Sequence, residues 1–166
     1  MVVAAAATLC ASTVAASGSA SAYDPETNPE PVRYAGDNRY ETAALIADEW
    51  GCGDATVVSG ENWPDGLAAS VLDDRILLVT RDSIPAATQA YFEDCDSEDI
   101  TIVGGPAAVS SAVLEALEDY DSDGHVQRIA GADRYATALE VARSNGTSGC
   151  VLLATGMNFP DALAGG

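Results

Sequence analysis

The side chains in this sequence best suited to holding a ligand are its arginines. The chain has 166 residues, a formal net charge of −19 and no lysine, so its seven basic side chains are all arginine. A guanidinium group holds a phosphate or a carboxylate through two parallel hydrogen bonds. The acidic remainder of the chain repels nucleic acid and anionic membranes, so we expect neither as a partner. Six arginines are placed by the pattern of the sequence, namely Arg33, Arg39, Arg75, Arg81, Arg128 and Arg134.

Four of these arginines lie in a block of sequence that occurs twice. Residues 33–44 (RYAGDNRYETAA) return as residues 128–139 (RIAGADRYATAL), and residues 60–68 (GENWPDGLA) return as residues 156–164 (GMNFPDALA). Two blocks that recur in the same order indicate a tandem duplication. Each copy is long enough to carry a small core of its own. The predicted modules are a first repeat over residues 33–127 and a second, partial repeat over residues 128–166.

The amino-terminal segment has the composition of a secretory signal peptide. Residues 1–22 carry no charge and end in Ala-Ser-Ala before Tyr23, which indicates cleavage after Ala22. A positively charged start is missing, so we expect the true start upstream of Met1. The apolar run is too short and too interrupted to span a membrane. Residues 23–32 are rich in proline and polar residues and are predicted to form an extended linker.

Short apolar runs alternate with segments of helical periodicity. Asn38 is placed to cap a helix that carries Glu41 at its third position, and Pro64 with Asp65 is typical of a helix start. Continuous apolar strands separated by helices predict a parallel sheet covered on both faces. The fold class is therefore α/β, a Rossmann-like parallel sheet in tandem modules. The predicted strands are residues 55–59, 76–80, 100–103 and 126–130, and the further predicted helices are residues 84–92 and 107–117.

The repeated motifs fall where the predicted strands end. Residues 35–36 and 130–131 are expected to end equivalent strands, while Gly60, residues 80–81 and residues 104–105 follow the others. Ligands of open parallel sheets bind at the carboxyl ends of the strands, where helix amino termini also point. We therefore expect arginines at this edge to hold an anionic ligand.

A structural role for the same arginines is an open alternative. Arg39 and Arg134 are then expected to pair with Asp65 and Asp161, or with neighbouring carboxylates, and to lock the modules together. The Asn-aromatic-Pro-Asp turn is interpreted as a helix start, in which asparagine satisfies free amides and the aromatic ring packs in the core. The residues expected to build the repeated motifs are Gly36, Tyr40, Thr42, Asn62, Pro64, Asp65, Gly104, Gly105, Gly131, Tyr135, Thr137, Asn158, Pro160 and Asp161.

The sequence offers no set of residues for catalysis. His125 is the only histidine, so there is no second imidazole for a zinc site or a proton relay. Ser59 lacks the preceding glycine of a nucleophile elbow. Residues 104–106 (GGP) follow a strand but have neither the spacing of a dinucleotide fingerprint nor a following Lys-Ser/Thr. We therefore expect no catalytic residue, no metal and no cofactor.

The cysteines predict one disulfide. Removal of the leader leaves three cysteines, an odd number in an oxidising compartment. Cys52 and Cys95 each precede a predicted strand by a few residues, which places both at the amino-terminal edge of one sheet, within reach of a disulfide. Cys150 occupies the place of Cys52 in the second copy. We predict a Cys52–Cys95 disulfide and a free Cys150.

The ordered motifs carry a family resemblance. Arg-x-Ala-Gly-x-(Asp/Asn)-Arg-Tyr-x-Thr-Ala is followed by Gly-x-Asn-(Phe/Trp)-Pro-Asp-(Ala/Gly)-Leu-Ala, by Ile-Leu-Leu and by Ile-Val-Gly-Gly-Pro-Ala-Ala-Val-Ser. Together these motifs cover nearly all of residues 33–166. The pattern resembles the type-2 cell-wall-binding repeat of secreted and surface-layer proteins.

The resemblance implies a non-catalytic module that anchors a secreted protein to the cell surface by binding an anionic wall polymer. It also implies three tandem copies that assemble as a pseudo-threefold unit. The family's Pro-Ile-Leu-Leu segment, associated with polymer binding, reads Arg75-Ile76-Leu77-Leu78 here. The alternative of a different class is a Rossmann-like enzyme, such as a wall hydrolase or a nucleotide-dependent protein, with its active site outside residues 1–166. The predicted polymer-binding residues are Arg33, Arg39, Arg75, Ile76, Leu77, Leu78, Arg128 and Arg134.

Overall fold

The structure is a computed structural model that describes residues 32–72, 74–95, 97, 99–146 and 153–160. The chain divides into two units, residues 1–33 and residues 34–166. Val32 and Arg33 are the described residues of the first unit, and the regular secondary structure of the described residues belongs to the second. The predicted leader, the linker before Val32, Cys150 and Asp161 lie outside the described residues.

A parallel sheet is the centre of the second unit. Within the described residues it has four strands, β1 (Ala55–Ser59), β2 (Arg75–Val79), β3 (Ile100–Val103) and β4 (Gln127–Ile129), in the order β2-β1-β3-β4. All three pairings are parallel. Each strand is a short apolar run between turns, as expected for strands buried on both faces. The predicted α/β class with a parallel sheet is confirmed.

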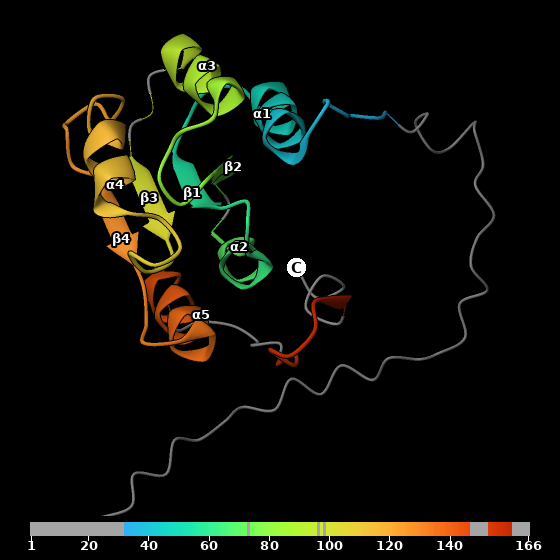
Figure 1. The fold of residues 1–166 in the computed structure, drawn as a ribbon, viewed down its shortest axis with the longest axis vertical. Helices are drawn as coiled ribbons and strands as arrows, with labels where there is room; N and C mark the ends of the chain where they lie inside the picture. Colours follow the sequence, from blue (N-terminus) through green and yellow to red (C-terminus); the bar gives the residue numbers. More distant parts are fainter. Residues whose placement is uncertain (1–31, 73, 96, 98, 147–152, 161–166) are drawn as a thin grey trace, which may run out of the picture. The chain divides into compact units, whose positions relative to one another are not determined.

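Helices cover both faces of this sheet. Figure 1 shows α1 (Arg39–Glu49), α3 (Ala86–Asp94) and α4 (Ser111–Leu117) on one side, and α2 (Trp63–Ala69) and α5 (Arg134–Ser144) on the other. Alternate residues of β1 enter the two cores: Val57 packs under α1, α3 and α4, whereas Val58 packs with residues of α2 and α5. None of the helices in the described part of the chain is long and apolar enough to cross a membrane.

Strand β4 and helix α5 belong to the second repeat. β4 and α5 contain the second copy of the arginine block, yet β4 pairs with β3 of the first repeat. Val141 of α5 is buried against Val58 and Val103 of the first repeat. The beginning of the second repeat therefore completes the sheet and one helical layer of the first.

The equivalent strand at the start of the first repeat is not formed. The sequence pattern predicts that residues 35–36 end a strand, but residues 32–36 carry no regular secondary structure. β4 is held by hydrogen bonds to β3, and within the described chain residues 32–36 have no corresponding strand beside them. The prediction is wrong because a strand needs a partner edge as well as a suitable sequence.

Capping explains where some helices begin. The Asn38 side chain accepts hydrogen bonds from the backbone N–H groups of Tyr40 and Glu41, as predicted, and Glu41 in turn accepts one from Asp37 N–H. The helix predicted from residue 107 instead begins at Ser111. Ala108 and Val109 donate to the Gly105 carbonyl, and this turn after β3 uses the residues assigned to the first helical turn. The predicted helix at 84–92 likewise lies at Ala86–Asp94.

The structure contains the predicted disulfide. Cys52 and Cys95 are joined with a Cα–Cα distance of 5.1 Å. Cys52 precedes β1, and Cys95 follows α3 and precedes β3. The bond therefore ties the amino-terminal edge of the sheet to the end of a covering helix.

Candidate binding site at the carboxyl edge of the sheet

The repeated arginine block holds the repeated Asn-aromatic-Pro-Asp block of its own copy. Arg39 Nη1 donates to the Gly60 carbonyl at 2.5 Å, and Arg134 Nη1 donates to the Gly156 carbonyl at 2.9 Å. The Tyr40 ring lies so close to Gly60 that a Cβ there would be 2.5 Å from the ring Cε1. The arrangement around Gly156 is equivalent, with a tyrosine ring again against the glycine. Both copies therefore contain the same contact, in which an arginine donates to the carbonyl of a glycine that packs against a tyrosine ring. We call this contact the latch.

The expected ion pairs of Arg39 and Arg134 are not the contacts that these arginines make. Both guanidinium groups donate to glycine carbonyls instead, and the salt bridges among the described residues are Arg81–Asp82 and Arg143–Glu140. The predicted ion pair between Arg39 and Asp65 is therefore wrong. The predicted partner of Arg134, Asp161, lies outside the described residues.

One threonine and one glycine close the turn before the latch in each copy. Gly36 N–H donates to Thr42 Oγ1 and Gly131 N–H donates to Thr137 Oγ1, each at 3.0 Å. A Cβ on Gly131 would collide with the backbone of Ala136, so the close approach of turn and helix requires glycine there. These motif residues therefore hold the turn close to the helix that follows it.

Two other arginines have structural partners as well. Arg128 Nη1 donates to the Gly104 carbonyl at 2.7 Å, and burial lowers the pKa of this guanidinium. Arg75 lies at the opposite, amino-terminal edge of the sheet, where it donates to the carbonyls of Trp50, Gly51 and Cys52 at 3.0 to 3.2 Å. Arg33 is exposed. The structure therefore separates Arg75 from the arginines at the carboxyl edge.

Aromatic side chains of the two repeats meet beside the latch. The Trp63 and Phe159 rings are 6.1 Å apart in an edge-to-face arrangement, and the Arg134 guanidinium lies 5.5 Å from the centre of the Trp63 ring. Trp63 is 36% exposed and Phe159 52% exposed, so the expectation that these rings pack in the core is wrong. Their partners come from the other repeat. A cation over an aromatic face adds an electrostatic attraction to this contact.

The Asp65 carboxylate lies beside Gly104. Burial raises the pKa of its carboxyl, and the positive charge of Arg134 acts in the opposite direction. Gly104 has φ of +126°, and a Cβ there would lie 2.8 Å from an Asp65 carboxylate oxygen. The glycine-rich turn after β3 thus makes room for this carboxylate.

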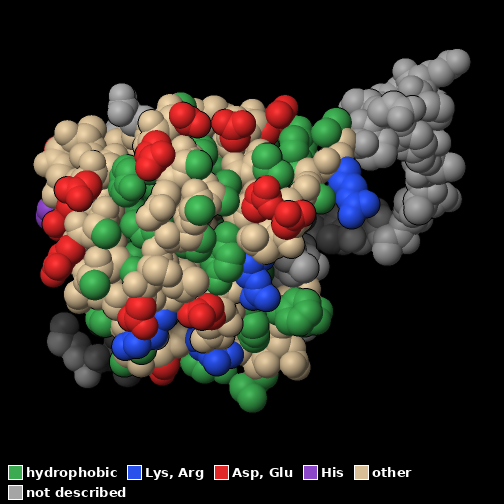
Figure 2. Space-filling model, turned by 45° about the horizontal axis from the view of Figure 1, so that its top comes forward, with side chains coloured by type: hydrophobic (Ala, Val, Ile, Leu, Met, Phe, Trp, Pro, Cys, Tyr) green, Lys and Arg blue, Asp and Glu red, His purple; other side chains and the backbone are tan. Residues whose placement is uncertain are grey.

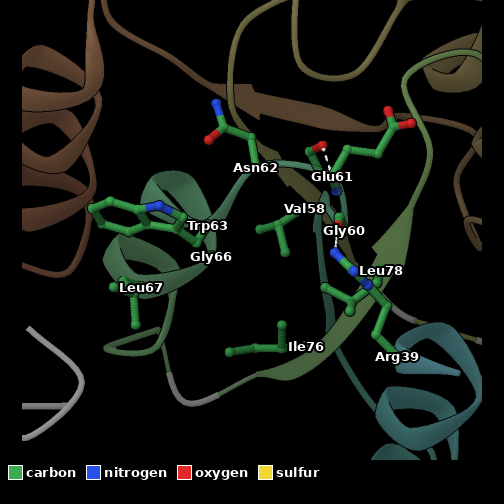
Figure 3. Close-up of a pocket in the computed structure, with 11 residues that line it drawn as sticks. Arg39, Val58, Gly60, Glu61, Asn62, Trp63, Gly66, Leu67, Ile76 and Leu78 are labelled. Atoms are coloured by element: carbon green, nitrogen blue, oxygen red, sulfur yellow. Dashed lines mark hydrogen bonds between the residues drawn. The ribbon is translucent and has the colours of Figure 1, made fainter. Parts of the chain in front are cut away.

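A cavity of about 350 Å³ opens next to Trp63. In Figure 3, Trp63 and Arg39 lie at opposite ends of this cavity, with Val58 and Ile76 between them and Glu61 on one side. Asn62 also lines it, at the cap position of α2, but its side chain makes no capping hydrogen bond, contrary to the predicted role. The cavity combines an aromatic face, a guanidinium, a carboxylate and an amide over an apolar floor.

The Ile76-Leu77-Leu78 segment is split between a core and this cavity. Leu77 is fully buried under α1, α3 and α4, whereas Ile76 and Leu78 are half-buried and line the cavity floor. The alternation follows from the two-residue period of a strand. Only the side chains of Ile76 and Leu78 are placed to touch a ligand.

Acidic side chains outnumber basic ones on the visible face of Figure 2, where separate Asp and Glu side chains are scattered and Arg side chains are few. Arg81 forms an exposed ion pair with Asp82, and its backbone N–H donates to a Glu61 carboxylate oxygen. Positive charge is therefore confined to a few separate arginines on an acidic chain.

The chain was compared with known protein families, proteins and structures. The model of the family described as Cell wall binding domain 2 (CWB2) matches residues 33–114 and 128–166. The chain belongs to the CWB2 family. The two matched segments begin with the two copies of the arginine block, so the tandem repeat is a repeat of CWB2 sequence. Membership places this CWB2 chain at the cell wall or cell surface.

Two curated relatives are from Bacillus subtilis (strain 168). The CWB2 chain is 30% identical to "Amidase enhancer" over 138 residues, which is 80% of this chain and 19% of that protein. It is 30% identical to "N-acetylmuramoyl-L-alanine amidase LytC" over 139 residues, 80% of this chain and 27% of that protein. The chain thus spans about a fifth to a quarter of the length of these relatives.

Two solved structures have the same fold. Cwp6 from Clostridium difficile matches with a TM-score of 0.60 and 32% identity over 67% of this chain and 18% of the other. Cwp8 from the same organism matches with a TM-score of 0.57 and 28% identity over 66% of this chain and 19% of the other. The fold of this CWB2 chain is therefore similar to that of parts of Cwp6 and Cwp8.

Sequence reasoning missed some residues that build the site. Glu61 is not predicted from the sequence, although it lines the cavity, and Ser59 is considered there only as a nucleophile. Ser59 Oγ accepts a hydrogen bond from Glu61 N–H. Glu61 is replaced by Met157 in the second copy, so the repeat gives no signal for it. Asn145 Nδ2 donates to the Val71 carbonyl of the first repeat at 2.8 Å. The sequence pattern of one copy does not predict a contact between copies.

Proposed function

We propose that this chain is a non-catalytic module that anchors a secreted protein to the cell wall by binding an anionic wall polymer. One observation carries the proposal: repeated residues of both copies, Trp63, Arg134 and Phe159, gather beside the cavity that contains Arg39. The CWB2 membership supports wall binding in general. The polymer and the residues that touch it are part of the proposal.

The chemistry of this region suits a charged polysaccharide. Partly exposed aromatic faces at Trp63 and Phe159 suit sugar rings. The Arg39 latch occupies one of the five donors of a guanidinium, which leaves others for a phosphate or carboxylate. In this proposal the latch holds the arginine in place, and the polymer binds to its remaining donors.

The remaining features of the proposal follow the family. Residues 1–22 act as a signal peptide, residues 23–32 as a linker, and residues 33–127 and 128–166 as a complete and a partial repeat. Further copies of the repeat assemble with these in a pseudo-threefold unit. The amidase activity in one relative's name belongs to that protein, of which this chain matches 27%. The chain itself binds without catalysing a reaction.

Sedimentation with purified cell walls tests the role of the arginines. The Arg39→Ala/Arg134→Ala variant is expected to bind about tenfold more weakly for each lost charge-assisted contact, at about 1.4 kcal/mol each. The control is Arg143→Ala, which removes one charge from an exposed pair with Glu140. It is compared with Arg39→Ala and with Arg134→Ala, each of which also removes one charge. Unchanged binding by the double variant contradicts the assignment. Thermal unfolding is measured in parallel, and a melted double variant assigns both arginines to the latch alone.

A further inference from the structure

We infer that the cavity beside Trp63 selects an anionic wall polymer that also carries primary ammonium groups, and that Glu61 is the residue that selects it. The inference rests on the proposed function and deepens it, because it names the chemical class of polymer that this cavity takes. It starts from the two charged side chains of the cavity, one of which has the wrong sign for holding an anion.

These two charges are opposite and do not neutralise each other. Among the described residues that line the cavity, the charged ones are Arg39 and Glu61, and both are exposed. In the part of the chain that the structure describes, no salt bridge joins them. Figure 3 shows the Glu61 side chain extending away from Trp63. A chain-like ligand that runs from Trp63 past Arg39 therefore meets a carboxylate as well as a guanidinium.

The Glu61 carboxylate is held in place by the turn after β2. Arg81 N–H donates to Glu61 Oε2 at 3.0 Å, and Glu61 N–H donates to Ser59 Oγ at 3.2 Å. The first of these bonds uses one of about four acceptor positions of a carboxylate. The other positions are open to a donor group of a ligand.

The second copy shows that this carboxylate is not needed for the latch. The counterpart of Glu61 is Met157, and Arg134 still donates to the Gly156 carbonyl at 2.9 Å. The Tyr135 hydroxyl donates to Met157 Sδ at 3.6 Å, a contact within the same copy. The carboxylate is therefore an addition that the first copy makes to a shared framework.

A carboxylate at this position opposes any ligand that is anionic along its whole length. Like charges at close range repel each other even in water, so Glu61 weakens the binding of a phosphate beside Arg39. An ammonium group reverses the sign, because it donates charge-assisted hydrogen bonds to a carboxylate. The pair of charges fits a polymer in which an ammonium follows a phosphate or carboxylate. Such an ammonium is carried by an ester-linked amino acid or by an amino sugar that lacks an acetyl group.

Charge-removing variants of the full-length protein test the role of Glu61. Glu61→Gln removes the charge but keeps an acceptor for Arg81 N–H, and Glu61→Met introduces the residue of the second copy. The matched control is Glu115→Gln, because Glu115 is exposed on α4, which covers the other face of the sheet from α2. Sedimentation with untreated cell walls is measured for each variant, with thermal unfolding in parallel.

Both Glu61 variants are expected to bind walls about tenfold more weakly, the change that one charge-assisted hydrogen bond carries, and Glu115→Gln is expected to bind as wild type does. The sign of the effect is decisive. Removing a repelling carboxylate would tighten binding to a wholly anionic polymer. Unchanged or tighter binding by folded Glu61→Gln therefore overturns the inference.

Chemically treated walls identify the ammonium. N-acetylation blocks all primary amines, whereas mild alkali removes only ester-linked amino acids. Wild-type binding is expected to fall about tenfold on acetylated walls, and Glu61→Gln is expected to be insensitive to acetylation. A fall after alkali as well assigns the ester-linked amino acid, and a fall after acetylation alone assigns the amino sugar. Equal wild-type binding to untreated and acetylated walls overturns the inference, whereas failure of the wild type to sediment with untreated walls overturns the proposed function.

Discussion

Removing the Cys52–Cys95 disulfide is expected to lower the free energy of unfolding by about 4 kcal/mol. The bonded cysteines are 43 residues apart in the sequence, and the chain-entropy relation gives an unfolded-state entropy loss of about 13 cal/mol/K for a loop of that length. At 25 °C this corresponds to ~4 kcal/mol. For a urea m-value of about 2 kcal/mol/M, the unfolding midpoint should fall by roughly 2 M.

The native structure gives a reason to expect the full effect. Arg75 donates to the carbonyls of Trp50, Gly51 and Cys52, so the segment before β1 has fastenings besides the disulfide. The native fold is then expected to survive loss of the bond, and the change falls on the unfolded chain. Cys95 is only 4% exposed, so alanine replaces it better than a polar residue.

Urea unfolding of Cys52→Ala/Cys95→Ala is compared with wild type under oxidising and reducing conditions. Reduced wild type and the double variant should lose similar stability, because both lack the cross-link. The reasoning is refuted if oxidised wild type and the double variant unfold at the same urea concentration. It is also refuted if non-reducing peptide mapping finds Cys150 bonded to Cys52 or Cys95.

Two further substitutions test local parts of the fold. Burial acts to raise the pKa of Asp121, but hydrogen bonds from His125, Asp123 and Ile100 outweigh it and lower that pKa. The ionised carboxylate therefore stabilises the folded protein fully above about pH 4, and this stabilisation is lost as pH falls through the lowered pKa. Asp121→Asn should cost about 1.5–3 kcal/mol at pH 7 and flatten the loss of stability toward pH 3, measured by urea unfolding at both pH values. Gly60→Ala should cost about 1–3 kcal/mol in thermal unfolding, because the new Cβ meets the tyrosine ring that packs on this glycine. Gly105→Ala, where a Cβ meets nothing within 4 Å, is its control, and equal melting of the two variants would contradict the latch.

The sequence predicts the sheet well because its strands are short continuous apolar runs. The bounds of β1 and β3 are those predicted, since Gly60 and Gly104 end both runs. It predicts the disulfide for a related reason, because parallel strands bring their amino-terminal ends to one edge. The segment at residues 32–36 shows the limit: its sequence suits a strand, but strand formation depends on a neighbouring edge.

The site is less predictable than the sheet. Charge patterns suggest carboxylate partners for arginines, whereas Arg39 and Arg134 bind backbone carbonyls, which every residue supplies and no letter of the sequence marks. Hydrophobicity places Trp63 in a core, whereas it meets Phe159 and Arg134 from the second copy. Contacts between copies depend on how the modules pack, and the periodicity of one copy does not contain that information.

The most direct test of the account is sedimentation of the mature protein with purified cell walls, before and after acid extraction of phosphate-bearing polymers. The account predicts that the protein sediments with untreated walls and stays in solution with extracted walls. Sedimentation should also weaken as salt concentration rises, because salt screens the attraction between arginines and an anionic polymer. Equal binding to extracted and unextracted walls would contradict the central claim.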